Sequence, residues 1–434
     1  MLGDHIYRTT LIFSDMKTTF KLRLLLLPAL FLLLGATPIW SQQAKDYHVI
    51  KGVVKDARTQ RVLEYVNLSV SGTNIGTITN INGEFSLKIK DSLKAKTIDI
   101  SHLGYSTSRI AINGHSMENV TVLMTPQPSL LDEITVRAID ARTLVEQAID
   151  RIEFNYSSKS NLLTGFYRET VKKRRSYINV SEAIVEILKN PYNEGLNEDM
   201  LQVYKGRKLI SPKADDTLMV KLLGGPNLSI YLDLVKNPDL MLNKGTLNYY
   251  KFAMEEAVMI QDRPHFVVSF TPQAVLPYAL HYGKLYIDRE SLAISRAEFS
   301  LSMDDKNKAT RAILRRKPMG MIFKPEDISF LVTYKQRDGK SYLNYIRSEI
   351  QFKCDWKKRL FSTNYTIVSE TVITGGRGEI LVKIPYRLAF KESQSLSDKV
   401  VSFYDPDFWE DYNIIEPDES LEYAVNRLKK EHQK

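Results

Sequence analysis

The sequence predicts a mainly β protein with a seven-stranded β-sandwich near the N-terminus and a larger antiparallel β-domain, a half-barrel or a sandwich, with a few helices. Three observations predict this fold class. Short alternating apolar runs recur between turn dipeptides over residues 49–125. Longer alternating runs fill residues 162–392, and helical periodicity is confined to residues 141–155 and 417–432.

Length and composition allow two or three folded domains. The chain has 434 residues, of which 43% are hydrophobic and 10% aromatic, so wholesale disorder is excluded. Its single Cys excludes an internal disulfide and a thiolate metal cluster. The formal net charge of +9 is modest for this length, and its basic clusters lie between strand-like runs. We therefore expect no binding to nucleic acid.

Residues 1–41 are predicted to be a signal peptide, with Met16 as an alternative start. A basic flank that begins at Lys17 precedes the apolar run 24–34, and small and polar residues come after it. The run is too short to span a bilayer, which needs about 20 apolar residues. We expect export to the periplasm or to the periplasmic or outer-membrane-associated cell envelope, with no transmembrane helix after cleavage.

Residues 46–126 are predicted to form the β-sandwich. The dipeptide Asn82-Gly83 is a strong hairpin signal, and Gly and Asn turns separate the other runs at regular spacing. The predicted strands are 49–55, 62–70, 77–79, 85–89, 97–101, 106–112 and 120–124.

This segment resembles a known domain family. The motifs that carry the resemblance occur in the order Gly52-Val53-Val54-Lys55-Asp56, Val66-Asn67-Leu68-Ser69-Val70, Thr73-Asn74-Ile75-Gly76-Thr77, Asn82-Gly83-Glu84-Phe85-Ser86-Leu87 and Leu103-Gly104-Tyr105. They resemble the carboxypeptidase regulatory-like domain, a transthyretin-like sandwich common in exported proteins of Gram-negative bacteria. Residues 131–136 resemble the segment that joins this domain to the plug of TonB-dependent outer-membrane receptors, although the residues after position 136 do not continue as a plug.

The resemblance does not imply a peptidase. A zinc carboxypeptidase holds its metal with a His-x-x-Glu pair and a later His, which leaves one position open for chemistry. His265 and His281 have no acidic partner at metal-ligand spacing. We expect no metal and no peptidase centre in this chain.

Residues 127–160 are predicted to be a linker with a helix at 141–155, and residues 161–399 to be the antiparallel β-domain. The run 177–188 fits either a strand or a helix because its Val, Ile and Ala residues suit both. The other strands and hairpins of the β-domain are expected at 165–170, 266–270, 283–290, 293–301, 328–336, 342–353 and 359–373.

Residues 285–294 resemble a hairpin in the half-barrels of lipoprotein-carrier proteins, in which strand–Asp–turn–strand units surround an apolar lumen. Aromatic residues are dense in this domain, and they would line such a lumen or fill the core of a sandwich. They are Tyr249, Tyr250, Phe252, Phe266, Phe270, Tyr278, Tyr282, Tyr286, Phe299, Phe330 and Tyr334.

Acidic residues of the large domain do not predict an active site. Arg168 and Glu169 are neighbours, so in a strand they point to opposite faces and cannot act as a pair. The doublets Asp215-Asp216 and Asp304-Asp305 lie in polar contexts typical of turns.

Nucleophile and phosphate motifs are also missing. Ser211 lacks the Gly-x-Ser-x-Gly setting, and the Gly-rich runs 224–226 and 375–378 lack the Lys-Ser/Thr of a phosphate loop. Cys354 lies near basic residues that could favour a thiolate, but packing in a strand is the favoured role. We expect no catalytic, cofactor-binding or metal-binding residues, and no cofactor.

Residues 400–434 are predicted to form an acidic, aromatic strap and a C-terminal helix with Asp418 as its N-cap. Eight acidic and no basic residues lie between positions 400 and 426, which would let the strap pair with the basic body of the chain. The stretch 403–415 is expected to dock on the β-domain or on a partner.

Together these features predict a non-enzymatic binding or scaffold protein of the cell envelope, whose partner is an envelope protein, a glycan or a lipid. The alternative is an envelope hydrolase with a dispersed active site. An apolar pocket or a smooth face would favour binding, whereas polar residues of shifted pKa clustered in a cleft would favour hydrolysis.

Overall fold

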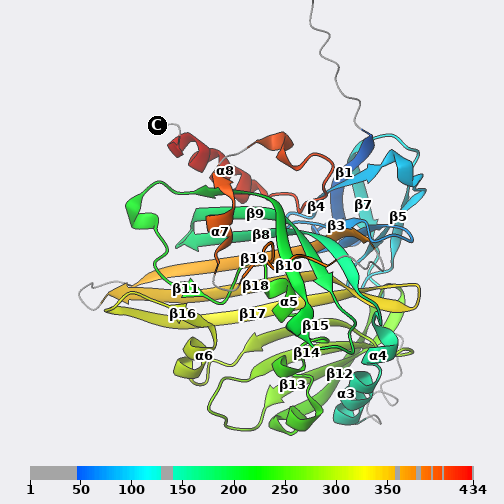
Figure 1. Cartoon of the computed structure of the whole chain (residues 1–434). Helices are drawn as coiled ribbons and strands as arrows, with labels where there is room; N and C mark the ends of the chain where they lie inside the picture. Colours follow the sequence, from blue (N-terminus) through cyan, green and yellow to red (C-terminus); the bar gives the residue numbers. More distant parts are fainter. Residues whose placement is uncertain are drawn as a thin grey trace, which may run out of the picture. The chain divides into compact units, whose positions relative to one another are not determined.

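Two groups of strands make up the described part of the chain (Figure 1). The structure, a computed structural model, describes residues 46–128, 140–356, 362–377, 383–391, 394–402 and 405–432. The predicted signal peptide and the segment 131–136 lie outside these residues. Tyr47–Lys434 form one compact unit, so the small sandwich and the large sheet pack as one body.

The small sandwich consists of seven strands in two sheets, as predicted. One sheet has the order β4-β1-β7 and the other β3-β2-β5-β6. The strands are β1 (Tyr47–Asp56), β2 (Asn67–Val70), β3 (Gly76–Ile78), β4 (Glu84–Lys90), β5 (Thr97–Ser101), β6 (Ser108–Ala111) and β7 (Met117–Met124), with the short helix η1 (Asp91–Leu93) after β4. β1 pairs with β7 in parallel, and the other pairs are antiparallel.

Two backbone positions shape this sandwich. The strand predicted at 62–70 is confined to β2, because Tyr65 has a left-handed φ of 56° that interrupts the pairing. Gly83 has a φ of 73° in the predicted turn, and a Cβ there would lie 2.7 Å from the Val54 carbonyl oxygen. The core of the sandwich is apolar and separate, with Ile50, Leu68 and Leu87 fully buried.

The large sheet has eleven strands in the order β12-β13-β14-β15-β17-β18-β19-β8-β9-β10-β20. Its strands are β8 (Asn161–Lys173), β9 (Ser176–Lys189), β10 (Met200–Ile210), β12 (Tyr250–Ile260), β13 (Arg263–Pro272), β14 (His281–Asp288), β15 (Ile294–Leu301), β17 (Met321–Arg337), β18 (Lys340–Trp356), β19 (Thr363–Arg377) and β20 (Val401–Ser402). A separate ribbon pairs β11 (Lys221–Leu222) with β16 (Leu314–Arg316).

The eleven strands form one open sheet with β12 and β20 at its edges, and not the two facing sheets of a second sandwich. All neighbouring strands are antiparallel except β10 and β20. The run 177–188 is part of strand β9, because both of its neighbours pair with it along most of its length. The predicted turn at Asp338-Gly339 is present, with positive φ at both residues.

Helices cover one face of the sheet, which we call the inner face. They are α3 (Ala141–Asp150), α4 (Ile152–Asn155), α5 (Leu228–Tyr231), η4 (Pro238–Leu240), η5 (Lys244–Tyr249) and α6 (Lys306–Ile313). The predicted helix 141–155 is therefore present as α3 and α4, separated at Arg151. Asp140 caps α3, since its carboxylate accepts from the Thr143 amide at 2.7 Å.

The outer face carries the sandwich and the end of the chain (Figure 1). Helix α8 (Glu419–His432) comes after the strap, which we define as residues 405–417. The Asp418 carboxylate accepts from the Leu421 amide at 2.9 Å, so the predicted N-cap is confirmed. The remaining short helices are η2 (Leu196–Glu198), η3 (Ala214–Asp216), α7 (Leu396–Lys399) and η6 (Pro406–Trp409).

Candidate ligand-binding pocket

A cavity of about 430 Å³ lies on the inner face of the large sheet. Its roof is residues 223–249, which contain α5, η4 and η5 and which we call the cover segment. Its other walls come from residues 278–281, which lead into β14, from one residue each of β12, β15 and β17, and from α6. The lining is Leu223, Tyr231, Leu232, Asp239, Leu240, Met241, Asn243, Thr246, Tyr249, Tyr250, Tyr278, Ala279, Leu280, His281, Leu301, Ala312, Ile313 and Phe330. The volume and the predominantly apolar lining are typical of small-molecule pockets.

His281 contributes a neutral ring to the wall of this cavity. Burial lowers its pKa to about 4, while a hydrogen bond with the Leu240 carbonyl opposes that shift. The ring packs edge-on against Phe299, with centroids 5.4 Å apart. His281 is therefore uncharged at neutral pH and tethers β14 to the cover segment.

Polar groups gather on the cover segment and at the mouth of the cavity. Asp239 and Asn243 are exposed, and Tyr231 and Tyr278 are 43% and 52% exposed. A ligand with an apolar body and a polar end would match this distribution of side chains.

Four buried charges, which we call the inner network, anchor the cover segment to the sheet. The Lys189 ammonium lies 2.7 Å from an oxygen of Asp199 and 2.8 Å from an oxygen of Asp233. Lys236 pairs with the other oxygen of Asp199 at 2.5 Å and donates to the Asn190 carbonyl at 2.6 Å. Lys189 and Asp199 flank the β9–β10 connection, whereas Asp233 and Lys236 belong to the cover segment.

Tyrosines complete the coordination of Asp233. The Tyr334 hydroxyl donates to one oxygen at 2.7 Å and the Tyr192 hydroxyl to the other at 3.0 Å. Burial raises the pKa of both tyrosines well above their usual value, and the Asp233 charge adds to this effect. Both hydroxyls therefore remain protonated donors.

The inner network is sealed. The four charged side chains are at most 2% exposed. Burial works against the charged form of Lys189, but Asp233 and Asp199 outweigh it and raise its pKa. Burial lowers the pKa of Lys236, and the neighbouring Lys189 charge lowers it further. Paired charges in a dry setting hold a segment in place and offer no route for a substrate.

A second hollow of about 630 Å³ lies on the other side of Tyr231. It is bordered by β10, by α5 and by residues 386–391, with Phe390 buried in its wall. The Asn227 side chain donates to the Phe390 carbonyl at 2.9 Å, which ties the cover segment to this later part of the chain. Tyr231 is thus the side chain shared by both hollows.

On the outer face, Glu182 lies between Arg168 and Arg207, and we call these three residues the outer network. Its carboxylate oxygens are each 2.8 Å from one guanidinium. Arg168 also donates to the Ile415 carbonyl, and Arg207 to the Asp405 carbonyl, both at 2.7 Å. The outer network therefore binds the backbone of the strap.

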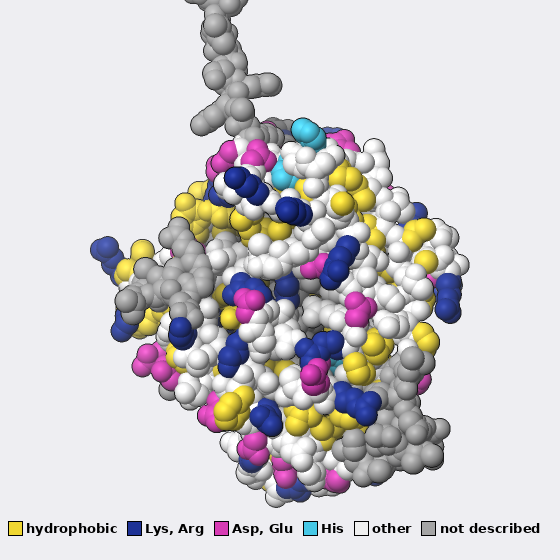
Figure 2. Space-filling model, turned by 90° about the vertical axis from the view of Figure 1, so that its right-hand side faces the viewer, with side chains coloured by type: hydrophobic (Ala, Val, Ile, Leu, Met, Phe, Trp, Pro, Cys, Tyr) yellow, Lys and Arg dark blue, Asp and Glu magenta, His cyan; other side chains and the backbone are white. Residues whose placement is uncertain are grey.

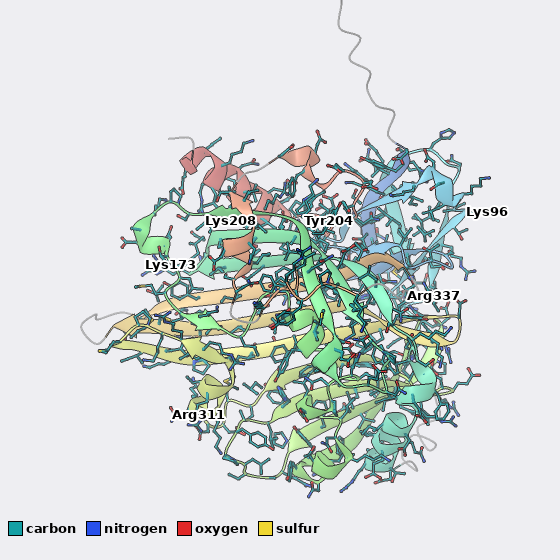
Figure 3. All side chains as sticks on the ribbon, viewed as in Figure 1. Lys96, Lys173, Tyr204, Lys208, Arg311 and Arg337 are labelled. Carbon is teal, nitrogen blue, oxygen red and sulfur yellow. The ribbon has the colours of Figure 1, made fainter. Side chains whose placement is uncertain are left out.

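A β-bulge in β10 directs the Arg207 side chain toward the strap. The register of β10 against β9 shifts between Val203 and Lys205, which leaves Tyr204 as an extra residue. Side chains alternate along the strand, and Leu201 and Val203 before the bulge face the inner core. After the bulge the odd-numbered residues Arg207 and Leu209 face outward instead, as bulges re-aim side chains. Tyr204, labelled in Figure 3, lies next to the strap with its ring centroid 5.9 Å from that of Tyr412.

The strap docks on its own chain, as its acidic composition suggests. Trp409 is 2% exposed and packs edge-on against Phe166. Lys205 pairs with Glu410 at 2.8 Å, and Lys90 of the sandwich pairs with Asp411 at 2.7 Å. Residues 403 and 404 of the predicted docking stretch lie outside the described residues.

Residues 50–136 match the family model of the CarboxypepD_reg-like domain. The chain carries a CarboxypepD_reg-like domain. Over 117 residues the chain is 31% identical to the TonB-dependent receptor SusC of Bacteroides thetaiotaomicron. That match covers 27% of this chain and 10% of the receptor, so the chain spans about a tenth of the curated relative that it matches.

Two solved structures share only a distant likeness. A DUF1329 family protein from Desulfovibrio piger is 11% identical, with 56% of this chain and 96% of that chain covered and a TM-score of 0.25. A protein of unknown function from Bacteroides fragilis is 8% identical, with 76% and 99% covered and a TM-score of 0.15. Neither likeness supports a function.

The CarboxypepD_reg-like domain contains one His-x-x-Glu pair, His115 and Glu118, which the prediction of no metal site did not take into account. Both residues are exposed at the start of β7. Within the described residues, no group of three or more His, Cys, Asp or Glu is close enough to hold a metal ion.

The domain also contacts the large sheet and the strap. The Thr77 hydroxyl donates to the Ile414 carbonyl at 2.7 Å, and Asn413 exchanges two hydrogen bonds with the backbone of Lys88. Ile78 is buried against Phe166 of the sheet and Trp409 of the strap. The CarboxypepD_reg-like domain is thus fixed to the rest of the molecule through the strap.

The candidates considered from sequence are distributed over separate places. Arg168 and Glu169 face opposite sides of the sheet, as predicted: Arg168 joins the outer network, while Glu169 accepts from the Tyr167 hydroxyl at 2.9 Å. His265 lies between the Arg263 carbonyl and the Ser295 hydroxyl, and burial lowers its pKa.

The remaining candidates have structural partners. Asp216 accepts from Ser211 at 2.7 Å, and Asp305 caps α6. Cys354 is buried, and burial raises the pKa of its thiol to about 11, which favours packing over a thiolate. The Gly-rich run 224–226 lies in the cover segment, and residues 375–377 end β19.

Of the eleven aromatic residues predicted to line a lumen or fill a core, some line the cavity and others fill the core. Tyr249, Tyr250, Tyr278 and Phe330 line the cavity. Phe266, Phe270 and Phe299 belong to the apolar core and Phe252 packs against it. Tyr334 also belongs to that core, and its hydroxyl donates to Asp233 of the inner network. Tyr282 is exposed, and Tyr286 lies beside Arg296.

No helix among the described residues is long and apolar enough to cross a membrane.

Proposed function

We propose that this protein binds an apolar or amphiphilic ligand, of the kind that an acyl chain provides, in the inner-face cavity and holds it without turnover. The observation that carries the proposal is the cavity of about 430 Å³ between the cover segment and the sheet. The cavity is lined mainly by apolar side chains, so an apolar ligand that displaces water from it binds with a favourable change in free energy.

The chemistry of the lining favours a lipid over a glycan or a protein segment. Leu232, Leu301 and Phe330 offer no hydrogen bonds, and His281 is neutral. A glycan would leave many hydroxyls unpaired against such a surface, at a cost of about 1–3 kcal/mol for each buried one. Asp239 and Asn243 on the cover segment suit the polar end of an amphiphile.

Hydrolysis is the less favoured function. The paired charges of the inner network are at most 2% exposed. In the cavity wall, burial lowers the pKa of His281 to about 4 and raises the pKa of Tyr250 to about 12, so neither is a general acid or base poised near neutral pH. A hydrolase needs such groups within reach of its substrate. The arrangement therefore supports retention of a ligand rather than its conversion.

The cell envelope is the proposed location. The basic flank and apolar run before Ser41 support export. The CarboxypepD_reg-like domain and the partial likeness to SusC, which is a TonB-dependent receptor, are compatible with it. N-terminal sequencing of the mature protein should find a start near Gln42, and an intact Met1 or Met16 would contradict export by cleavage.

A cavity-filling variant tests the binding proposal. Ala312→Trp places a large ring in the cavity wall, whereas Ala253→Trp adds the same ring at an exposed position of β12. With a fluorescent fatty acid as probe, we expect Ala312→Trp to weaken binding by at least about tenfold, and Ala253→Trp to bind as the unmodified protein does.

Two outcomes would reject the proposal. One is equal binding of the probe by both variants and the unmodified protein. The other is release of product from an ester or peptide substrate, measured by mass spectrometry, which would favour the alternative that the protein is a hydrolase.

A further inference from the structure

Helix α6, which walls the cavity, and the strand β16 after it carry a cluster of positive charge. Residues 306–317 contain six basic and no acidic residues. The cluster, which we call the basic rim, consists of Lys306, Lys308, Arg311, Arg315, Arg316 and Lys317. Ala312 and Ile313 of the same segment face the cavity, so the rim lies on the outside of the cavity wall.

The charges of the basic rim are available to a partner. Arg311, Arg315, Arg316 and Lys317 are exposed, and Arg311, a residue of α6, is labelled in Figure 3. Within the described residues, none of the six is in an ion pair with a carboxylate. The adjacent Asp305 is engaged as the cap of α6, where it accepts from the amides of Asn307 and Lys308.

Charge elsewhere is arranged differently. Figure 2 shows acidic and basic side chains interspersed on the face that lies at the right of Figure 1. In the basic rim, residues 306–317, all charged side chains are positive, and Asp304 and Asp305 precede it directly in the chain. A surface of this kind attracts a dense array of negative charges.

Exposed apolar side chains accompany the rim. Met319, two residues after Lys317, is 97% exposed. Val275 is 92% exposed in the β13–β14 loop, and Arg311 donates to the Pro277 carbonyl of that loop at 3.4 Å. Tyr278 of the same loop lines the cavity and is 52% exposed. Cations beside isolated large apolar side chains and a tyrosine are the composition of membrane-surface segments.

We propose that the basic rim, Met319 and Val275 dock the protein on the surface of an anionic phospholipid bilayer, with the cavity beside the lipid. Arg and Lys would pair with lipid phosphates, while the two apolar side chains enter the interface. The docking goes beyond ligand binding and holds whether or not the cavity is filled.

Vesicle flotation with the mature full-length protein tests the docking. We expect the protein to float with vesicles of phosphatidylcholine and phosphatidylglycerol but not with phosphatidylcholine alone, and salt to weaken the association. Arg315→Glu with Arg316→Glu should reduce the partition coefficient by a factor of about 30 or more. Lys94→Glu with Lys96→Glu, exposed residues of the sandwich with the same change in net charge, should leave it unchanged.

A separate variant tests how much the apolar side chains Met319 and Val275 contribute to vesicle binding. Met319→Ser with Val275→Ser should remove the part of the binding that persists at high salt. Equal flotation with both vesicle types, or equal loss in the two charge variants, would overturn the proposal. The fatty-acid probe is measured without vesicles, where the Arg315 and Arg316 variant should bind normally, so failure of docking and failure of ligand binding are distinguishable.

Discussion

The inner and outer networks hold different kinds of segment with different cations. The inner network uses two lysines, whose ammonium groups are surrounded by Asp199, Asp233 and a backbone carbonyl. The outer network uses two arginines, which share Glu182 and have donors left for the backbone of the strap. A planar guanidinium can bond a carboxylate and a carbonyl at once, whereas an ammonium acts as a point charge.

This difference predicts how each network responds when its central carboxylate is removed by mutation. Without Asp233, two lysines remain in a dry interior with one carboxylate between them. Without Glu182, each arginine retains a strap carbonyl as acceptor. The cover segment should therefore depend more strongly on its acid than the strap depends on Glu182.

The largest effect is expected for Asp233→Asn. The change removes a charge that pairs with Lys189 and accepts from two tyrosines, so we expect a loss of about 4 kcal/mol in the free energy of unfolding. Urea unfolding measures it. Asp239→Asn, at an exposed position of the same segment, should change stability by less than about 0.5 kcal/mol. Similar losses for the two variants would show that the inner network does not anchor the cover segment.

Glu182→Gln should have the next largest effect, a loss of about 3 kcal/mol. Hydrogen exchange should increase in the strap, because the neutral amide no longer holds both guanidinium groups in place. Glu410→Gln alters a carboxylate that is 67% exposed and pairs only at the surface, so it should cost about 0.5 kcal/mol or less. An unchanged exchange rate in the strap of Glu182→Gln would contradict the assignment.

The cavity wall should make stability depend on pH. The folded-state pKa of His281 is about 4, below its ordinary 6.5, so between these values the unfolded chain binds a proton that the folded chain does not. Stability is therefore complete above pH 6.5 and falls as the pH drops toward 4, by at most about 3 kcal/mol from this group. Burial lowers the pKa of His102 to about 4 and also lowers the pKa of His265, so these residues contribute over the same pH range. His281→Gln should therefore make the curve shallower without abolishing its slope, and His115→Gln, at an exposed site, should leave it unchanged.

The smallest effect is expected at the end of the chain. Asp418→Ala removes the cap of α8 and should cost about 1 kcal/mol. Its signature is faster hydrogen exchange at the amide of Leu421, which loses its acceptor. Glu419→Ala, next to the cap, keeps that hydrogen bond and should leave the exchange rate as it is. Equal rates in the two variants would count against the cap.

Local patterns were sufficient to predict the sandwich and the terminal helix. Turn dipeptides such as Asn82-Gly83 determine where strands end, and Asp418 with the apolar stripe after it determines where α8 begins. These features depend on neighbours in the chain, so they can be read from sequence. The docking of the acidic strap could also be predicted, because its charge is opposite to that of the body.

The cover segment and its network could not be predicted. Its short helices are too brief for periodicity to be detected, and Asp233 and Lys236 look like surface residues until the fold brings Lys189 and Asp199 to them. The only local signal is that they alternate with Leu232, Leu234 and Val235, which places charges inside an apolar run. The bulge that directs Arg207 outward likewise depends on pairing between strands.

The order of strands in the large sheet has a consequence for the rate of folding. Strands β8, β9 and β10 form one meander, and β12 to β15 with β17 to β19 form another; in the described sheet the two meanders meet where β19 pairs with β8. That junction pairs Tyr365 with Lys173 and Arg377 with Leu162, residues far apart along the chain. Closing so long a loop is slow compared with forming a hairpin. The two meanders should therefore form early and the seam between them late, which leaves two long strand edges exposed until β19 has been synthesised and paired.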